Sequence, residues 1–197
     1  MRKHWVFATF LGLGIADRGL FMLAYPRAFG YPDSVSYASS ARNNYMSMWR
    51  PYGYSEFLKF FGLAHSPLIV LVQHVMILAL CVMAYAFLVR RGVRRWVAAL
   101  AILPLLVSPI EITLEHYVLA ETLFTVLLTV GLLLVLALTR KSWATATVLR
   151  RTVVAAIAGG FLAAAWLTRT IGMPIFILAG LYLIIRIRRV RLVPVIA

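Results

Sequence analysis

The sequence has few acidic residues and almost no cysteine. Its 197 residues include six Asp and Glu against 20 Lys and Arg, and Cys81 is the single cysteine. One cysteine excludes an intramolecular disulfide. The CxxC, HExxH, glycine-rich phosphate-loop and G-x-S-x-G patterns are also missing. Zinc hydrolysis, Walker-type nucleotide hydrolysis and serine-hydrolase chemistry therefore lose support.

Apolar residues, in contrast, are abundant. They make up 63% of the chain, and the mean hydropathy is +0.91, outside the range of soluble domains. A spanning helix needs about 20 apolar residues, and the candidate stretches are 5–25, 67–89, 95–110, 118–138, 152–168 and 171–186. The sequence therefore predicts an all-α polytopic membrane protein with about six transmembrane helices, in a single domain over residues 1–197.

Charge placement predicts how these helices are oriented. Basic residues gather at the N-terminus and around 90–95, 140–151 and 186–191, and the acidic residues avoid these positions. The positive-inside rule then makes both termini cytoplasmic, with a first external loop at 26–66 and a second at 111–117. The net charge of +14 is interpreted as a topology feature aided by anionic lipid. Nucleic-acid binding is not expected, because the basic clusters are short and carry no soluble domain.

The first predicted span carries two charges. The basic N-terminus and the apolar run after it resemble a cleavable signal peptide, but the run continues to Tyr25, which favours a full span. Asp17 and Arg18 interrupt its outer half. Intramembrane charges usually face a protein interior or a watery cavity, so at least one should find a partner, although Arg18 could instead snorkel to the outer interface.

The first external loop is the only long polar interruption of the chain. Its many aromatic residues predict short helices lying in the membrane interface, at 34–45 and 55–61. It holds Asp33, which follows Pro32 and precedes a helical run. One interpretation of Asp33 is a helix N-cap; the other is a catalytic carboxylate, and the two roles are compatible.

A second acidic site is predicted near the start of the fourth span. It contains Glu115, His116 and Glu121, on the same predicted side as Asp33. Carboxylates with histidine can hold Mg²⁺ or Mn²⁺, and Glu121 and Asp33 are the candidate ligands. The cluster has no metal-ligand spacing, so the use of a metal is left open.

Five segments in order carry a family resemblance. PDSVSY, RPYGYSEFL, HSPLIVLVQH, LEHYVLAETLF and LTRTIG resemble the N-terminal part of bacterial polytopic glycosyltransferases of the C superfold. That family uses polyprenyl-phosphate sugars and includes protein O-mannosyltransferases and aminoarabinose transferases. The similarity covers most of residues 5–186. Two departures stand out: Ser34 follows Asp33 where many relatives carry a second acid, and family members are usually much longer.

The resemblance implies an inverting transferase in the bacterial plasma membrane, acting at its external face. It would move a sugar from a polyprenyl-phosphate donor to a hydroxyl of a glycan, lipid or protein acceptor. The family's first-loop catalytic base corresponds to Asp33, and its second acid to Glu115 or Glu121. One carboxylate suffices as general base, because the phosphate leaves as a stable anion.

Four further residues are candidates for donor binding. Arg50 and Arg169 could contact the donor phosphate. Tyr37 and Tyr54 could contact the sugar or the lipid, or could simply anchor the protein in the interface. The alternative function is a non-catalytic membrane subunit for lipid binding or assembly, or an inactive truncated copy of the enzyme. If the native chain ends at Ala197, the missing spans would weaken the enzyme interpretation.

Overall fold

The computed structural model describes residues 4–47, 50–61, 67–139, 143 and 146–192. The segment predicted as the first external loop, 26–66, is therefore described except at 48–49 and 62–66. Within these residues the chain is all-α, and it is an integral membrane protein by the length and apolar character of its helices. The helices are α1 Trp5–Ala24, α2 Pro32–Asn43, α3 Gly53–Phe61, α4 Pro67–Arg90, α5 Arg95–Val107, α6 Pro109–His116, α7 Ala120–Leu138, α8 Val148–Thr168 and α9 Gly172–Leu192.

Four of the six predicted spans are single helices that could cross a membrane, and the other two differ from the prediction. In the described residues, α1, α4, α7 and α8 are each long and apolar enough to cross a membrane. The span expected at 95–110 is instead a pair, α5 and α6, bent by 48°, and α9 is apolar over Gly172–Ile185. The bend falls at Ser108, whose backbone is extended, because Pro109 disfavours a helical conformation in the residue before it.

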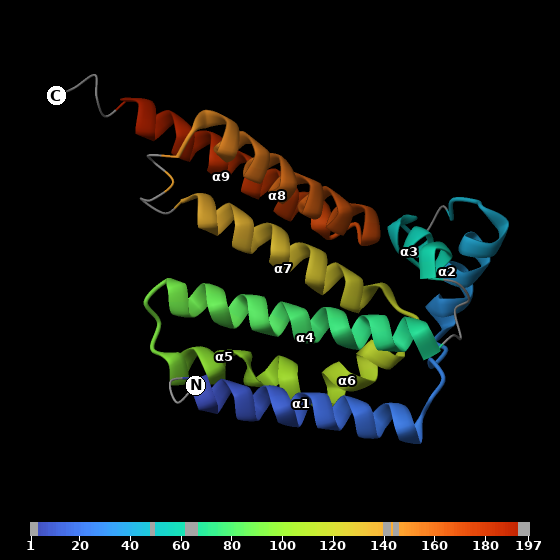
Figure 1. The fold of residues 1–197 in the computed structure, drawn as a ribbon. Helices are drawn as coiled ribbons and strands as arrows, with labels where there is room; N and C mark the ends of the chain where they lie inside the picture. Colours follow the sequence, from blue (N-terminus) through green and yellow to red (C-terminus); the bar gives the residue numbers. More distant parts are fainter. Residues whose placement is uncertain (1–3, 48–49, 62–66, 140–142, 144–145, 193–197) are drawn as a thin grey trace.

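The long helices lie side by side as one bundle (Figure 1). α1 packs on α5 and α4, α4 packs on α7, and α8 lies against both α7 and α9. α7 approaches α8 closely at Gly131, where a Cβ would lie 2.7 Å from Leu162 side-chain atoms. Small residues of this kind let membrane helices approach without loss of packing.

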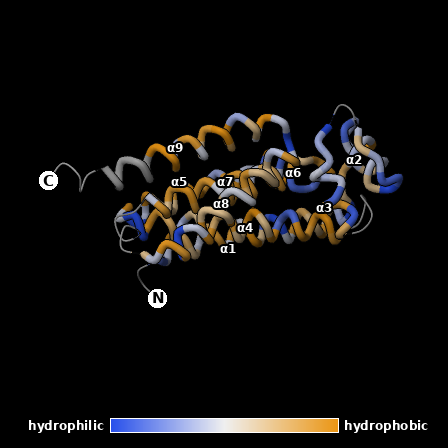
Figure 2. Tube along the Cα trace, turned by 90° about the horizontal axis from the view of Figure 1, so that it is seen from above, coloured by the Kyte–Doolittle hydropathy of each residue, from blue (hydrophilic) through white to orange (hydrophobic). Residues whose placement is uncertain are grey.

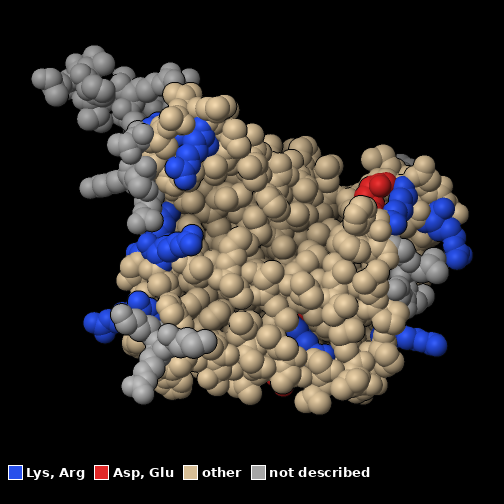
Figure 3. All heavy atoms as spheres, viewed as in Figure 1, with Lys and Arg blue, Asp and Glu red and all other residues tan. Residues whose placement is uncertain are grey.

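The polar segments lie at the two ends of the bundle. α2 and α3 sit at one end and form its hydrophilic cap (Figure 2). Lys and Arg side chains gather at both ends, and the face between them is largely uncharged (Figure 3). The predicted helices at 34–45 and 55–61 are confirmed as α2 and α3, each beginning two residues earlier than expected. The segment expected as a second external loop, 111–117, is mostly helix α6, with Glu115 and His116 buried.

Candidate active site

The N-terminus of α2 places Asp33 at the end of the bundle. Pro32 opens the helix, and the backbone N–H of Tyr31 donates to Ser34 Oγ at 2.9 Å. Tyr31, not Asp33, is the N-cap residue, so the N-cap interpretation of Asp33 is corrected. Asp33 lies instead in the first turn of α2, where its negative charge still favours the helix.

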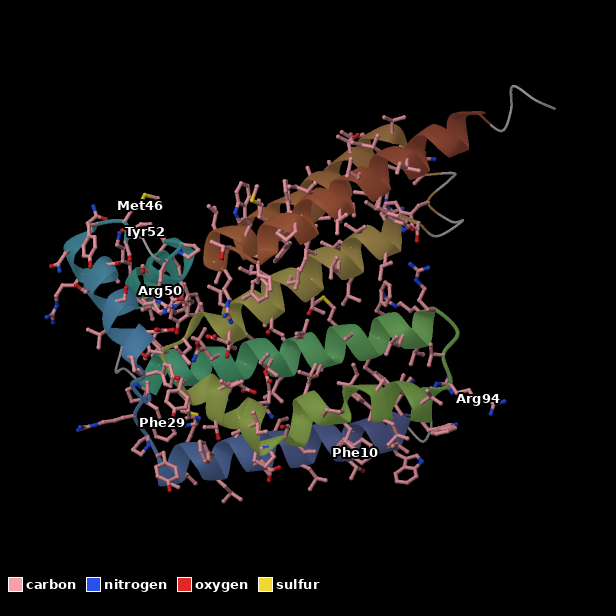
Figure 4. All side chains as sticks on the ribbon, turned by 180° about the vertical axis from the view of Figure 1, so that it is seen from behind. Phe10, Phe29, Met46, Arg50, Tyr52 and Arg94 are labelled. Carbon is pink, nitrogen blue, oxygen red and sulfur yellow. The ribbon has the colours of Figure 1, made fainter. Side chains whose placement is uncertain are left out.

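Asp33 forms an ion pair with Arg50, and this pair is half-exposed. The guanidinium also lies over the ring of Tyr37, 5.5 Å from its centroid. Burial disfavours the charged guanidinium, but Tyr37 and Asp33 outweigh this effect and raise the pKa of Arg50. A carboxylate and a permanent cation therefore lie together at the end of the bundle that carries α2 and α3, where Figure 4 labels Arg50.

Tyr54 connects this surface pair to the interior. It is fully buried, its ring meets that of Tyr37 edge-on at 5.0 Å, and its hydroxyl donates to Gln73 Oε1 at 3.1 Å. Burial raises the pKa of Tyr54, with smaller effects from Tyr37 and Glu121, so the hydroxyl stays protonated as a donor. Gln73 in turn donates to the carbonyl oxygens of Glu115 and Tyr117 at 2.6 and 3.1 Å.

A second ion pair lies at the same end. Arg169, the residue that ends α8, donates to Glu121 in the first turn of α7 at 2.6 Å. Both side chains are partly exposed. The two pairs share one end of the bundle because α3 begins against α8: a Cβ on Gly53 would lie 2.6 Å from the carbonyl oxygen of Leu167. Only glycine permits this approach.

Arg18 and Glu115 form a buried ion pair inside the bundle. Arg18 Nε and Nη2 donate to the two carboxylate oxygens of Glu115 at 2.8 and 2.5 Å, and His74 Nδ1 lies 2.5 Å from Oε2. Arg18 also donates to the carbonyls of Leu105 and Leu106 at 3.0 and 2.7 Å. The prediction that Arg18 finds a partner inside the bundle is thus confirmed, and the alternative, that Arg18 snorkels to the outer interface, is wrong. Asp17 is exposed.

The predicted site residues consequently separate into two groups. The structure brings Asp33, Tyr37, Arg50 and Tyr54 into one chain of contacts, with the Glu121–Arg169 pair at the same end. Glu115 and His116 have other neighbours: Glu115 pairs with Arg18, and the His116 ring lies 4.8 Å from that of His74. Glu115, His116 and Glu121, predicted as a second acidic site, therefore do not form one cluster of direct contacts.

Asp33 and Glu121, the candidate metal ligands, each pair with an arginine. Within the described residues, no group of three or more His, Cys, Asp and Glu side chains is placed to hold a metal ion. The Mg²⁺ or Mn²⁺ site remains a prediction.

Two residues that contact the candidate site were not predicted from the sequence. Gln73 joins Tyr54 to the α6–α7 connection, and His74 contacts Glu115. In the sequence, Gln73 and His74 are two adjacent polar residues inside an otherwise apolar run. Such a pair indicates polar partners within a membrane bundle.

Comparison with known proteins identifies a family. The sequence model of a family described as dolichyl-phosphate-mannose-protein mannosyltransferase matches residues 69–193, more than half of the chain. The matched stretch contains Glu121 and Arg169 but not Asp33. No curated protein and no solved structure matches the chain.

Proposed function

Since the chain belongs to the dolichyl-phosphate-mannose-protein mannosyltransferase family, we propose that it transfers a sugar from a polyprenyl-phosphate donor to an acceptor hydroxyl, with Asp33 as the general base. Membership supports a membrane glycosyltransferase that uses a lipid-linked sugar. The observation that carries the residue assignment is the Asp33–Arg50 ion pair, which is half-exposed at the end of the bundle. There a carboxylate that accepts a proton lies beside a cation that attracts phosphate.

The proposed reaction needs little else from the protein. Asp33 takes the proton of the acceptor hydroxyl as that oxygen attacks the anomeric carbon of the sugar. The bond between this carbon and the phosphate oxygen breaks on the opposite face, so the configuration inverts. The electron pair leaves with the polyprenyl phosphate, whose added negative charge Arg50 or Arg169 stabilises.

The two ion pairs have a role before the donor arrives. Asp33 neutralises Arg50 and Glu121 neutralises Arg169 in the free protein. A donor phosphate can replace Asp33 as the partner of Arg50, or Glu121 as the partner of Arg169. Exchange at Arg50 would free Asp33 to accept the acceptor proton. Glu121 is accordingly proposed to hold Arg169 in position, and Tyr37 and Tyr54 to shape the surface that receives the sugar.

The test is transfer of radiolabelled mannose from polyprenyl-phosphate mannose to acceptors in membranes that contain the full-length protein. Asp33→Asn retains the size of the side chain but not its basicity, so we expect transfer to fall at least about a hundredfold. Glu56→Gln is the matched control, because Glu56 is an exposed acid of the same loop that pairs with Lys59. Wild-type transfer by Asp33→Asn would remove Asp33 from the mechanism and favour the non-catalytic alternative.

A further inference from the structure

A cavity of about 510 Å³ lies at the end of the bundle opposite to α2 and α3. The first turn of α1, the end of α4 and the start of α5 line it. Its volume is within the usual range for sites that bind small molecules. Arg94, which lines this cavity, and Arg50 lie at opposite ends of the molecule (Figure 4). The cavity is therefore separate from the candidate active site, and its assignment does not depend on the proposed function.

The polar part of the cavity is positively charged. Arg94 and Arg95 both line it, both are exposed, and in the described part of the chain neither forms an ion pair with an acid. Arg94 is also the N-cap residue of α5 and has no side-chain cap, so free backbone N–H groups of the helix start lie at the same place. Two guanidinium groups and a helix N-terminus together favour an anion.

The rest of the cavity is aromatic. Trp5 and Trp96 line it with 66% and 53% of their surface exposed. Deeper in the wall, the Phe7 ring stacks on Tyr85 at 3.9 Å, and the Tyr85 hydroxyl lies 2.7 Å from His4 Nδ1. Exposed tryptophans at the ends of spanning helices lie at the level of the lipid headgroups. The cavity thus offers cations to a headgroup and aromatic surface to the chain below it.

We propose that this cavity binds the phosphate of an anionic phospholipid from the leaflet at this basic end of the bundle. Arg94 and Arg95 contact the phosphate, and Trp5 and Trp96 flank the glycerol and the upper acyl chains. Basic pockets between membrane helices are suited to anionic headgroups, whereas charges that only set topology need no cavity. The lipid would also join α1 to α5, which pack on one another.

Native mass spectrometry of the purified full chain in detergent tests the proposal. Dioleoyl phosphatidylglycerol and dioleoyl phosphatidylcholine are titrated separately, and the dissociation constant of the first bound lipid is measured. We expect phosphatidylglycerol to bind more tightly by roughly tenfold to thirtyfold, the attraction that two basic residues near an anionic lipid provide. The double variant Arg94→Gln/Arg95→Gln should lose most of this preference, and Arg94→Lys/Arg95→Lys should keep most of it.

Arg150→Gln/Arg151→Gln removes the same charge from the start of α8 and is the matched control. It should keep the wild-type preference. An equal loss in both glutamine doubles, or equal affinity of the wild type for the two lipids, overturns the proposal. Displacement of the lipid by millimolar inorganic phosphate assigns the site to free phosphate and also overturns it. If Arg94→Gln/Arg95→Gln does not fold by circular dichroism, Trp96→Ala takes its place, and an unchanged affinity for phosphatidylglycerol overturns the site.

Discussion

Ser34 Oγ donates a hydrogen bond of 2.8 Å to the carbonyl oxygen of Val118, which fastens the first turn of α2 to the connection between α6 and α7. Beside it, the Phe29 N–H donates to the His116 carbonyl at 2.7 Å, and the Val118 N–H donates to the Phe29 carbonyl at 3.1 Å. These bonds fix the residue before Ser34, Asp33, relative to the start of α7. Ser34 thus ties the turn that carries Asp33 to the α6–α7 connection.

Ser34→Ala should destabilise the protein and reduce transfer. The substitution leaves the buried Val118 carbonyl without its donor, which costs about 1–3 kcal/mol, and it loosens the turn that holds Asp33. We expect a lower unfolding temperature in detergent and a several-fold lower turnover. Ser39→Ala is the control, because Ser39 accepts a hydrogen bond from Asn43 at the surface. Identical behaviour of the two variants would contradict the positioning role.

Arg18 and Glu115 should stabilise the bundle only when both are present. Removing one partner leaves a buried charge uncompensated, which typically costs about 3–5 kcal/mol. Arg18→Met and Glu115→Leu should therefore each lower the unfolding temperature strongly. Arg18→Met/Glu115→Leu removes both charges and should be less damaging than the sum of the single changes. A thermal-unfolding double-mutant cycle measures this coupling. Additive effects in that cycle would show that the two side chains act independently.

The helices could be predicted from the sequence because the length of an apolar run sets a span. The expected stretch 67–89 is α4 within a residue of each bound, and 5–25 is α1. The bend between α5 and α6 could not be predicted from apolar content, because the expected stretch 95–110 continues past Ser108, and most of α6 lies in the segment expected as an external loop. Its stability depends on a distant residue: Pro109 has no N–H for the Leu105 carbonyl, and Arg18 donates to that carbonyl instead.

The candidate site could be predicted only in part, because some of its contacts join residues that are distant in the sequence. The polar loop and its aromatic content indicated where Asp33, Arg50 and Tyr54 would gather. The pairing of Glu115 with Arg18, 97 residues away, depends on how α1 and α6 pack, and no local pattern specifies it. Glu115 and Glu121 are close in sequence yet have different partners, because the chain leaves α6 at Tyr117 with an extended backbone and begins α7 at Ala120.

Topology is testable by cysteine labelling. Asn43 lies exposed at the predicted external end, and Arg90 lies exposed at the end of α4. In a Cys81→Ala background, an impermeant maleimide should label Asn43→Cys in intact cells, and should label Arg90→Cys only after the membrane is permeabilised. Labelling in the opposite order would invert the orientation that the basic clusters predict.

Arg169 should contribute to donor binding more than to turnover. It ends α8 beside Glu121 and is 41% exposed in its side chain, so a donor phosphate can reach it. Arg169→Ala should raise the KM for polyprenyl-phosphate mannose roughly tenfold or more, as expected for loss of a charge-assisted contact. Arg169→Lys should restore only part of this loss, because an ammonium group cannot make the two parallel bonds of a guanidinium.

The control for Arg169 is Arg42→Ala, which removes an exposed arginine from α2 in the same cap. If bulk positive charge attracts the donor, both alanine variants should raise the KM equally, and the effect should disappear at high salt. If Arg169 makes a specific contact, only its variant should change the KM, and much of the effect should persist in salt. Initial rates at varied donor concentration, measured at low and high ionic strength, separate the two outcomes. An unchanged KM for Arg169→Ala would leave Arg50 as the arginine that receives the phosphate.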